Sequence, residues 1–163
     1  MTAHPFHTPF EALPASIPVF PLTGALLLPG GRLPLNIFEP RYLAMIDDAL
    51  ATNRLVGMIQ PQPGDGRGEG GYRGAGTDQP DLYSIGCAGR LSGFAESDDG
   101  RYLITLSGVC RFRVEQEMPT TRGYRRCQVS WNDFERDLDA PPESIEGFER
   151  EPFEERLQDY LKI

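Results

Sequence analysis

The sequence has 163 residues, 39% of them hydrophobic, which is enough for one folded domain with its own core. Gly (18) and Pro (15) are frequent, which favours short strands and many turns over long helices. The net charge is −8, and most of it lies in residues 133–159, which hold eleven acidic residues and three arginines. No part of the chain has the basic balance that phosphate binding needs, so nucleic acid is a disfavoured partner.

Several signals concern the location of the protein. The first residues lack the basic start and apolar stretch of a secretion signal, and no apolar run approaches the roughly 20 residues of a membrane span. The three cysteines contain no CxxC pair and fit a reducing compartment. We therefore expect a cytoplasmic protein with no membrane partner. Residues 1–16, with three prolines, are predicted to form a flexible N-terminal tail.

Residues 17–42 form the densest apolar stretch and predict two strands followed by a helix. The strands are expected over residues 17–22 and 33–38. Pro18 and Pro21 cannot donate ladder hydrogen bonds, so the first strand is expected at an edge or a bulge. Glu39 and Pro40 mark the start of the helix.

Apolar residues at helical spacing extend this helix over about residues 40–52, and Asn53 is suited to a left-handed stop. The apolar positions are Tyr42, Met45, Ile46, Ala49 and Leu50.

The rest of the chain predicts a curved sheet. Residues 55–60 form a buried strand, and residues 61–80, with seven glycines and three prolines, are predicted to be a mobile loop. Three long alternating segments with interior glycines follow, and they suggest a partly closed antiparallel sheet. Asp98, Asp99 and Gly100 form a hairpin turn between two of them. Residues 136–163 are predicted to be an acidic linker and the beginning of a helical segment that stops in mid-stripe at Ile163.

Three stretches resemble a known family. PVFPL at 18–22, LPGGRLPLNIFEPRY at 28–42 and IGCAGRL at 85–91 are similar to the N-terminal domain of Lon-type ATP-dependent proteases. The resemblance covers roughly residues 15–135 and is closer to small standalone bacterial proteins built on this domain. It implies a mainly β (α+β), PUA-like pseudo-barrel over residues 17–135, with about six bent antiparallel strands and a crossing helix. In the protease this domain helps to engage protein substrates, so the resemblance implies a polypeptide-interaction module.

The residue counts argue against most catalytic chemistries. The single lysine, Lys162, is second-last and follows Leu161, so it suits neither a Ser-Lys protease pair nor a P-loop. His4 and His7 both lie in the predicted tail, where a catalytic triad is not expected. The cysteines fall on apolar strand faces, as small hydrophobic residues do. We predict a non-enzymatic protein with no catalytic residue, no metal and no cofactor.

The candidate site is the opening apolar stretch. An exposed apolar ledge would accept polypeptide segments, either against side chains or along a strand edge that prolines keep from self-pairing. The predicted peptide-binding residues are Leu26, Leu28, Phe38, Arg41 and Tyr42. Core packing is the alternative explanation for the leucines, and a local ion pair between Glu39 and Arg41 is the alternative for the arginine.

Other partners are left open. An RNA- or small-ligand-binding PUA-like domain is the alternative function, because arginines between residues 111 and 126 could form a basic stripe beside Tyr124. A homodimer is also compatible with the sequence.

Overall fold

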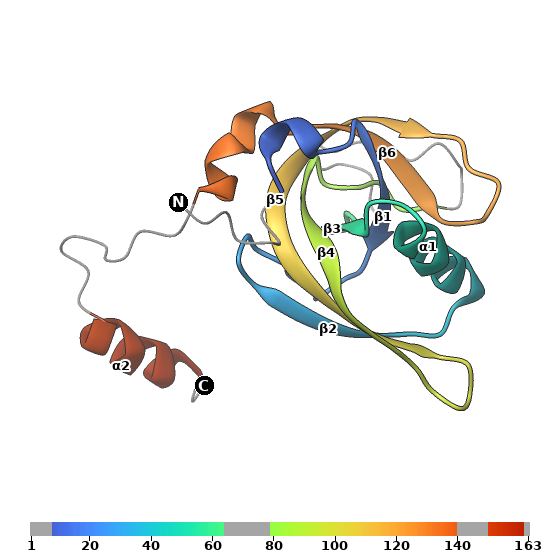
Figure 1. Cartoon of the computed structure of the whole chain (residues 1–163). Coiled ribbons are helices and arrows are strands. Elements are labelled where there is room, and N and C mark those ends of the chain that lie inside the picture. The colour runs from blue at the N-terminus through green and yellow to red at the C-terminus, as the bar shows by residue number, and fades with distance from the viewer. Residues whose placement is uncertain (1–7, 64–78, 140–149, 162–163) are drawn as a thin grey trace.

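A computed structural model describes residues 8–63, 79–139 and 150–161 of the chain (Figure 1). Its elements, in chain order, are η1 (Phe10–Ala12), β1 (Ser16–Pro21), β2 (Arg32–Ile37), α1 (Pro40–Leu50), β3 (Leu55–Ile59), β4 (Ile85–Glu96), β5 (Tyr102–Met118), β6 (Arg125–Ser130), η2 (Asn132–Leu138) and α2 (Arg150–Leu161). The strands form one sheet in the order β2-β5-β4-β3-β1-β6, and β5 also pairs with β6 and closes a ring. This mainly β pseudo-barrel with a crossing helix confirms the predicted fold class.

The ring closes through β5, which is 17 residues long. Its first part pairs with β2 from Tyr102 to Ser107, and its last part pairs with β6 from Arg113 to Met118. On its other edge β5 pairs with β4, and the register shifts twice, once before Gly89 and once before Gly93. Such bulges bend a strand and increase its twist, so the interior glycines give the predicted curvature.

One detail of the predicted topology is wrong, because not all strand pairs are antiparallel. β1 pairs with β3 in parallel and with β6 in antiparallel orientation, so β1 is a central strand and not an edge. Its prolines are tolerated because each lies where one neighbour is not paired. Pro18 precedes the first pair with β3, and Pro21 lies beyond the last pair with β6.

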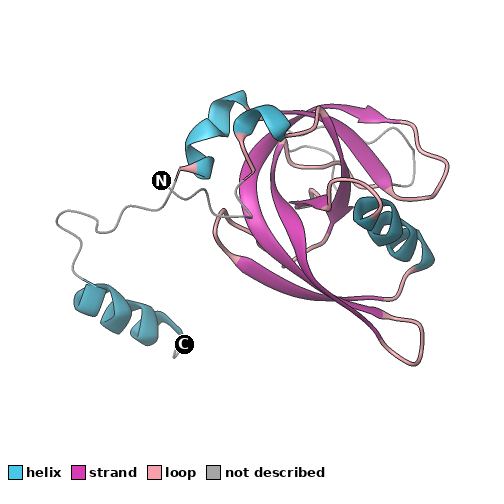
Figure 2. Ribbon diagram, viewed as in Figure 1, coloured by secondary structure: helices cyan, strands magenta, loops and turns pink. Residues whose placement is uncertain are grey.

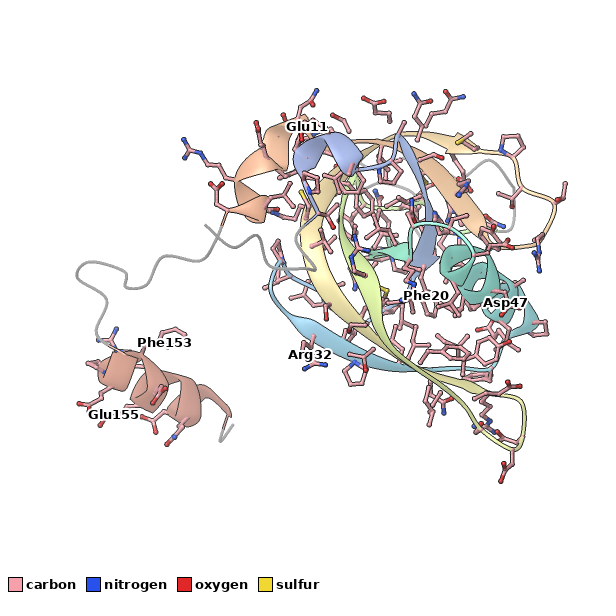
Figure 3. The ribbon with its side chains drawn as sticks, in the orientation of Figure 1. Glu11, Phe20, Arg32, Asp47, Phe153 and Glu155 are labelled. Carbon is pink, nitrogen blue, oxygen red and sulfur yellow. The ribbon has the colours of Figure 1, made fainter. Side chains whose placement is uncertain are left out.

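Two hydrophobic cores lie on opposite faces of β1 and β3, and both strands are therefore buried on both faces. The α1-side core is covered by α1; Figure 3 shows Phe20 of this core between β1 and α1. The η-side core is covered by η1 and η2, and Figure 2 shows these two short helices on one side of the barrel and α1 on another. The α1-side core contains Phe20, Leu27, Ile37, Tyr42, Met45, Ile46, Ala49, Val56, Met58, Cys87, Leu91, Ile104, Leu106 and Tyr124. The η-side core contains Ile17, Val19, Leu55, Ile59, Leu82, Ala88, Cys110, Phe112, Val114, Cys127, Val129, Trp131 and Phe134.

The helix α1 begins at Pro40, as the sequence predicts, and buries Tyr42, Met45, Ile46 and Ala49. It ends at Leu50, and the left-handed residue that follows it is Arg54 (φ 61°) and not Asn53. The side chain of Asn53 instead accepts a hydrogen bond from the Leu55 backbone N–H at 3.0 Å. The predicted left-handed stop is therefore displaced by one residue.

The described part of the predicted tail packs against the barrel. Phe10 and Leu13 contact the η-side core, and the carbonyl of Pro14 accepts a hydrogen bond from the Trp131 indole at 2.8 Å. Residues 1–7 lie outside the described residues, as do residues 64–78 of the predicted loop. The domain boundaries remain predictions. No helix in the described ranges is long and apolar enough to cross a membrane.

Candidate polypeptide-binding surface

The loop between β1 and β2 presents two leucines to solvent on either side of a buried one. Leu27 belongs to the α1-side core, whereas Leu26 is 71% exposed and Leu28 is 55% exposed. The loop closes with a tight turn in which the Gly31 N–H donates to the Leu28 carbonyl at 2.9 Å. Gly30 has a φ of +75° there, a conformation that favours glycine.

Hydrogen bonds hold this loop in place. Gly30 donates to the Gly108 carbonyl at 3.0 Å, and Gly108 donates to the Gly31 carbonyl at 2.8 Å. The side-chain amide of Gln60 donates to the carbonyls of Leu22 and Ala25. The two leucines are therefore exposed on an anchored loop and not on a free one.

The loop also depends on the absence of a side chain at one position of β5. A Cβ added at Gly108 would lie 1.9 Å from the Leu28 carbonyl oxygen. Only glycine therefore fits beneath this loop without displacing it.

The other predicted residues have different surroundings. Phe38, directly after β2, is 62% exposed, and the Arg101 guanidinium lies 5.8 Å from its ring centroid. Arg41 forms an ion pair with Glu39 at 2.9 Å, with both side chains about half exposed, so the local ion pair considered from the sequence is present. It also lies 4.6 Å from the centroid of the Tyr42 ring.

Tyr42 lies in the core. It is only 7% exposed, and its ring packs 4.1 Å from the ring of Phe20, measured between centroids. Burial raises the pKa of its hydroxyl. Tyr42 supports the helix that carries Arg41 and presents little surface of its own.

The five predicted residues do not form a single patch. Leu26 and Leu28 precede β2, and Phe38 follows it. A six-residue strand is roughly 20 Å long, so the two exposed apolar groups flank the two ends of β2.

Sequence reasoning missed a surface groove beside β2. It has a volume of about 520 Å³ and is lined by residues 34–36 of β2, 93–95 of β4 and 103–105 of β5. Phe94 and Leu103 are exposed here. Leu103 is an apolar residue on the outward face of β5, between the inward-facing Tyr102 and Ile104. This departure from the polar outward positions is the sequence feature that could have indicated the groove.

Four of the five arginines proposed as a basic stripe are engaged in ion pairs, and the fifth, Arg126, has no ion pair within the described residues. Arg111 pairs with Asp137 at 2.8 Å, Arg113 with Asp133 at 3.0 Å, and Arg125 with Glu117 at 2.8 Å inside the protein. Arg122 pairs with Asp48, which also accepts a hydrogen bond from the Tyr124 hydroxyl. Tyr124 is buried, so neither a row of unpaired arginines nor an exposed stacking ring supports RNA binding here.

The three cysteines are free and buried. Burial raises the pKa of Cys87 and of Cys127 to about 12, and the pKa of Cys110 to about 11. Since the thiolate is the reactive form, these thiols are inert at neutral pH. Within the described ranges, no group of three His, Cys, Asp or Glu residues could hold a metal ion.

Comparisons with known proteins agree with this architecture. The profile of the family described as the ATP-dependent protease La (LON) substrate-binding domain matches residues 16–162. The Lon protease of Desulfosudis oleivorans is 29% identical over 110 residues, which is 68% of this chain and 13% of that protein. Lon protease 2 of Sorangium cellulosum is 31% identical over 118 residues, 70% of this chain and 13% of that protein. The chain thus spans a small fraction of the length of these relatives.

Solved structures show the same likeness. The crystal structure of a Lon N-terminal domain protein from Xanthomonas campestris has a TM-score of 0.55 and 29% identity, over 71% of this chain and 59% of that chain. The N-terminal domain of the Mycobacterium avium complex Lon protease has a TM-score of 0.51 over 80% of this chain and 57% of that chain. At 16% identity, it supports the fold alone. Because the family profile covers most of the sequence, the chain belongs to the family of Lon substrate-binding domains.

Proposed function

We propose that this protein is a non-enzymatic interaction module that binds polypeptide segments through the exposed apolar residues beside β2. Family membership supports this proposal, because the family that matches residues 16–162 is described as a substrate-binding domain. The buried, protonated thiols and the lack of a second lysine or of histidines beyond residue 7 support a role without chemistry.

One observation carries the proposal, namely the anchored exposure of Leu26 and Leu28. Hydrogen bonds and the Gly108 contact already fix the loop, so its conformation does not depend on these two side chains. Burying a leucine side chain is worth about 1.5–3 kcal/mol, and a partner that covers both would gain that burial without having to order the loop. A cytoplasmic location and the absence of cofactors remain part of the proposal.

Binding of an unfolded polypeptide tests the proposal directly. We would titrate the chain into fluorescein-labelled, reduced and carboxymethylated α-lactalbumin and measure fluorescence anisotropy. The wild-type chain should bind, and the double variant Leu26→Ser, Leu28→Ser should bind at least tenfold more weakly. Binding should resist added salt, whereas RNA binding would weaken steeply with salt.

A matched control distinguishes binding at this surface from non-specific hydrophobic binding. Met118→Ser alters another exposed apolar side chain at the far end of β5 and should leave binding unchanged. If the wild-type chain does not bind, or if both variants lose binding equally, the proposal is wrong.

A further inference from the structure

The strand β2 is the open edge of the sheet. It pairs only with β5, and no other described segment pairs with it. In Figure 1 it forms the lower margin of the barrel. Each of the remaining described strands pairs with at least two neighbours, because β5 pairs with β6 as well as with β2 and β4 and so closes the ring. An edge of this kind exposes backbone groups that can pair with another strand.

The register identifies the backbone groups that face away from β5. Arg32 lies opposite Ser107, so residue 31 lies opposite residue 108, and the Gly108 N–H donates to the Gly31 carbonyl. Hydrogen-bonded pairs alternate along an antiparallel ladder, so residues 33, 35 and 37 bond to β5. Arg32, Pro34 and Asn36 therefore point their backbone groups outward.

This outward edge is competent for pairing but interrupted at its centre. Three carbonyls and the N–H groups of Arg32 and Asn36 are available, whereas Pro34 has no N–H to donate. Proline at an edge hinders open-ended sheet growth, which natural sheets avoid. The pattern leaves two donors spaced to bond a single short strand.

The side chains around the edge are apolar. Leu33 and Leu35 are only partly buried against the α1-side core, although they face inward. Leu28 and Phe38 are exposed at the two ends of the strand. A strand added along β2 would complete the burial of Leu33 and Leu35 and would contact Leu28 and Phe38.

The only charged residue of β2 lies at the Leu28 end. Arg32 is exposed, and no described carboxylate lies within ion-pair distance of it, unlike Arg41 and Arg101 at the other end. Figure 3 shows its side chain on the outer side of β2, directed away from the barrel. An acidic side chain in a bound segment would be the complementary partner.

We propose that β2 binds an extended polypeptide segment by strand addition, and that the preferred segment alternates apolar residues and carries an acidic residue next to Arg32. This inference rests on the proposed function and specifies its mode. It predicts that main-chain hydrogen bonds supply the affinity, with the alternate side chains and the acidic residue supplying the preference.

Backbone methylation of a probe tests strand addition without altering the protein. The probe is a fluorescein-labelled peptide, Glu-Val-Thr-Val-Thr-Val-Thr-Val-Glu, and binding is measured by anisotropy. Alternate amides of an added strand face β2, so N-methylation of the three threonine amides and N-methylation of the four valine amides should have different effects on the affinity. Methylation of one set should weaken binding at least tenfold, and methylation of the other set should weaken it less than threefold. Equal losses, or no loss in either set, would overturn the proposal.

Protein variants place the binding on β2. Asn36→Pro removes an outward N–H without removing a bond to β5 and should weaken binding at least tenfold, whereas Asn36→Ala should not. Arg32→Glu should weaken the acidic probe about threefold, in line with exposed ion pairs, and should favour a probe with lysine at both ends. Unchanged binding by both Asn36 variants would contradict the assignment.

Three outcomes separate this inference from the proposed function and from self-association. If unfolded α-lactalbumin binds but the peptide does not, the proposed function stands and strand addition fails. If neither binds, the proposed function itself fails. If sedimentation velocity shows a dimer that Asn36→Pro abolishes, β2 pairs with a second copy of the chain and the proposal is overturned.

Discussion

The two cores of this barrel differ in how their borders are covered. The η-side core is covered by η1 and η2: the carbonyl of Phe134 accepts a hydrogen bond from the Cys110 thiol at 3.4 Å, and Asp137 accepts one from the Arg111 backbone N–H at 3.0 Å. The α1-side core has a wider border of partly buried apolar residues. These are Leu22, Ala25, Leu33, Leu35, Leu43, Leu50 and Tyr102.

The difference suggests separate roles for the two sides of the barrel, with the η side stabilising the fold and the α1 side offering a surface for binding. On the η side, Asp137 satisfies a backbone donor of β5 in the gap between its pairs with β2 and its pairs with β6. On the α1 side, no described segment pairs with the outer edge of β2, which is flanked by Leu28 and Phe38. A covered border is what a fold needs, whereas an apolar border beside a free strand edge is what a binding surface needs.

The largest expected effect is in the η-side core. Phe112 is fully buried, and its ring packs 5.9 Å from Trp131, measured between centroids. Phe112→Ala should lower the free energy of unfolding by about 3–5 kcal/mol, through lost burial and the cavity left behind. Urea unfolding followed by Trp131 fluorescence would measure it. A loss below about 1 kcal/mol would mean that this core is not the stability centre inferred here.

The contact between Gly108 and the β1–β2 loop should be next in size. Gly108→Ala places a Cβ against the backbone of Leu28, which cannot move aside as a flexible side chain can. We expect a loss of about 2–3 kcal/mol and weaker polypeptide binding, because Leu26 and Leu28 shift with the loop. Gly93→Ala is the matched control, since its added Cβ would lie 3.2 Å from the Thr105 hydroxyl. Equal losses in both variants would argue against a special role for this contact.

The Arg111–Asp137 pair should have a smaller and pH-dependent effect. Hydrogen bonding from Arg111 lowers the pKa of Asp137 in the folded state. The ionised carboxylate is therefore stabilising at pH values above the ordinary aspartate pKa of about 4, and the stabilisation is lost as the pH falls through the lowered value. Asp137→Ala should cost about 1–2 kcal/mol at pH 7, since Arg111 is half exposed.

Thermal unfolding of both proteins between pH 7 and pH 3 would check this dependence. The difference between wild type and variant should shrink as the solution is acidified. A difference that stays constant down to pH 3 would assign the effect to packing of η2 and not to charge.

Sequence reasoning succeeded where a pattern has one local cause. The helix start at Glu39 and Pro40, the inward face of Leu33, Leu35 and Ile37, and the turn at Gly100 all follow from local backbone chemistry. The burial of the three cysteines followed equally from strand alternation. Each of these depends on residues within a few positions along the chain.

It failed where the cause is a distant segment. Pro18 and Pro21 predict an edge or bulged strand, but only the staggered pairing with β3 and β6 explains how a central strand tolerates them. Tyr42 is predicted both on the apolar stripe of the helix and in the candidate site, and its 7% exposure and its contact with the Phe20 ring place it with the core. The edge that prolines were expected to protect is β2, which carries Pro34, but the sequence alone does not distinguish Pro34 from Pro18 and Pro21 on the central strand.

The smallest expected effect on stability belongs to the exposed leucines, and it is the most informative. Leu26 and Leu28 are mostly solvated, so Leu26→Ser with Leu28→Ser should change the free energy of unfolding by less than about 0.5 kcal/mol, while polypeptide binding is lost. Urea unfolding and anisotropy on the same samples would measure both quantities. A stability loss like that of Gly108→Ala would instead mean that the leucines support the loop, and their exposure would then be no argument for binding. Because the loop is anchored by backbone bonds to Gly108 and by the Gln60 amide, we expect the two properties to separate.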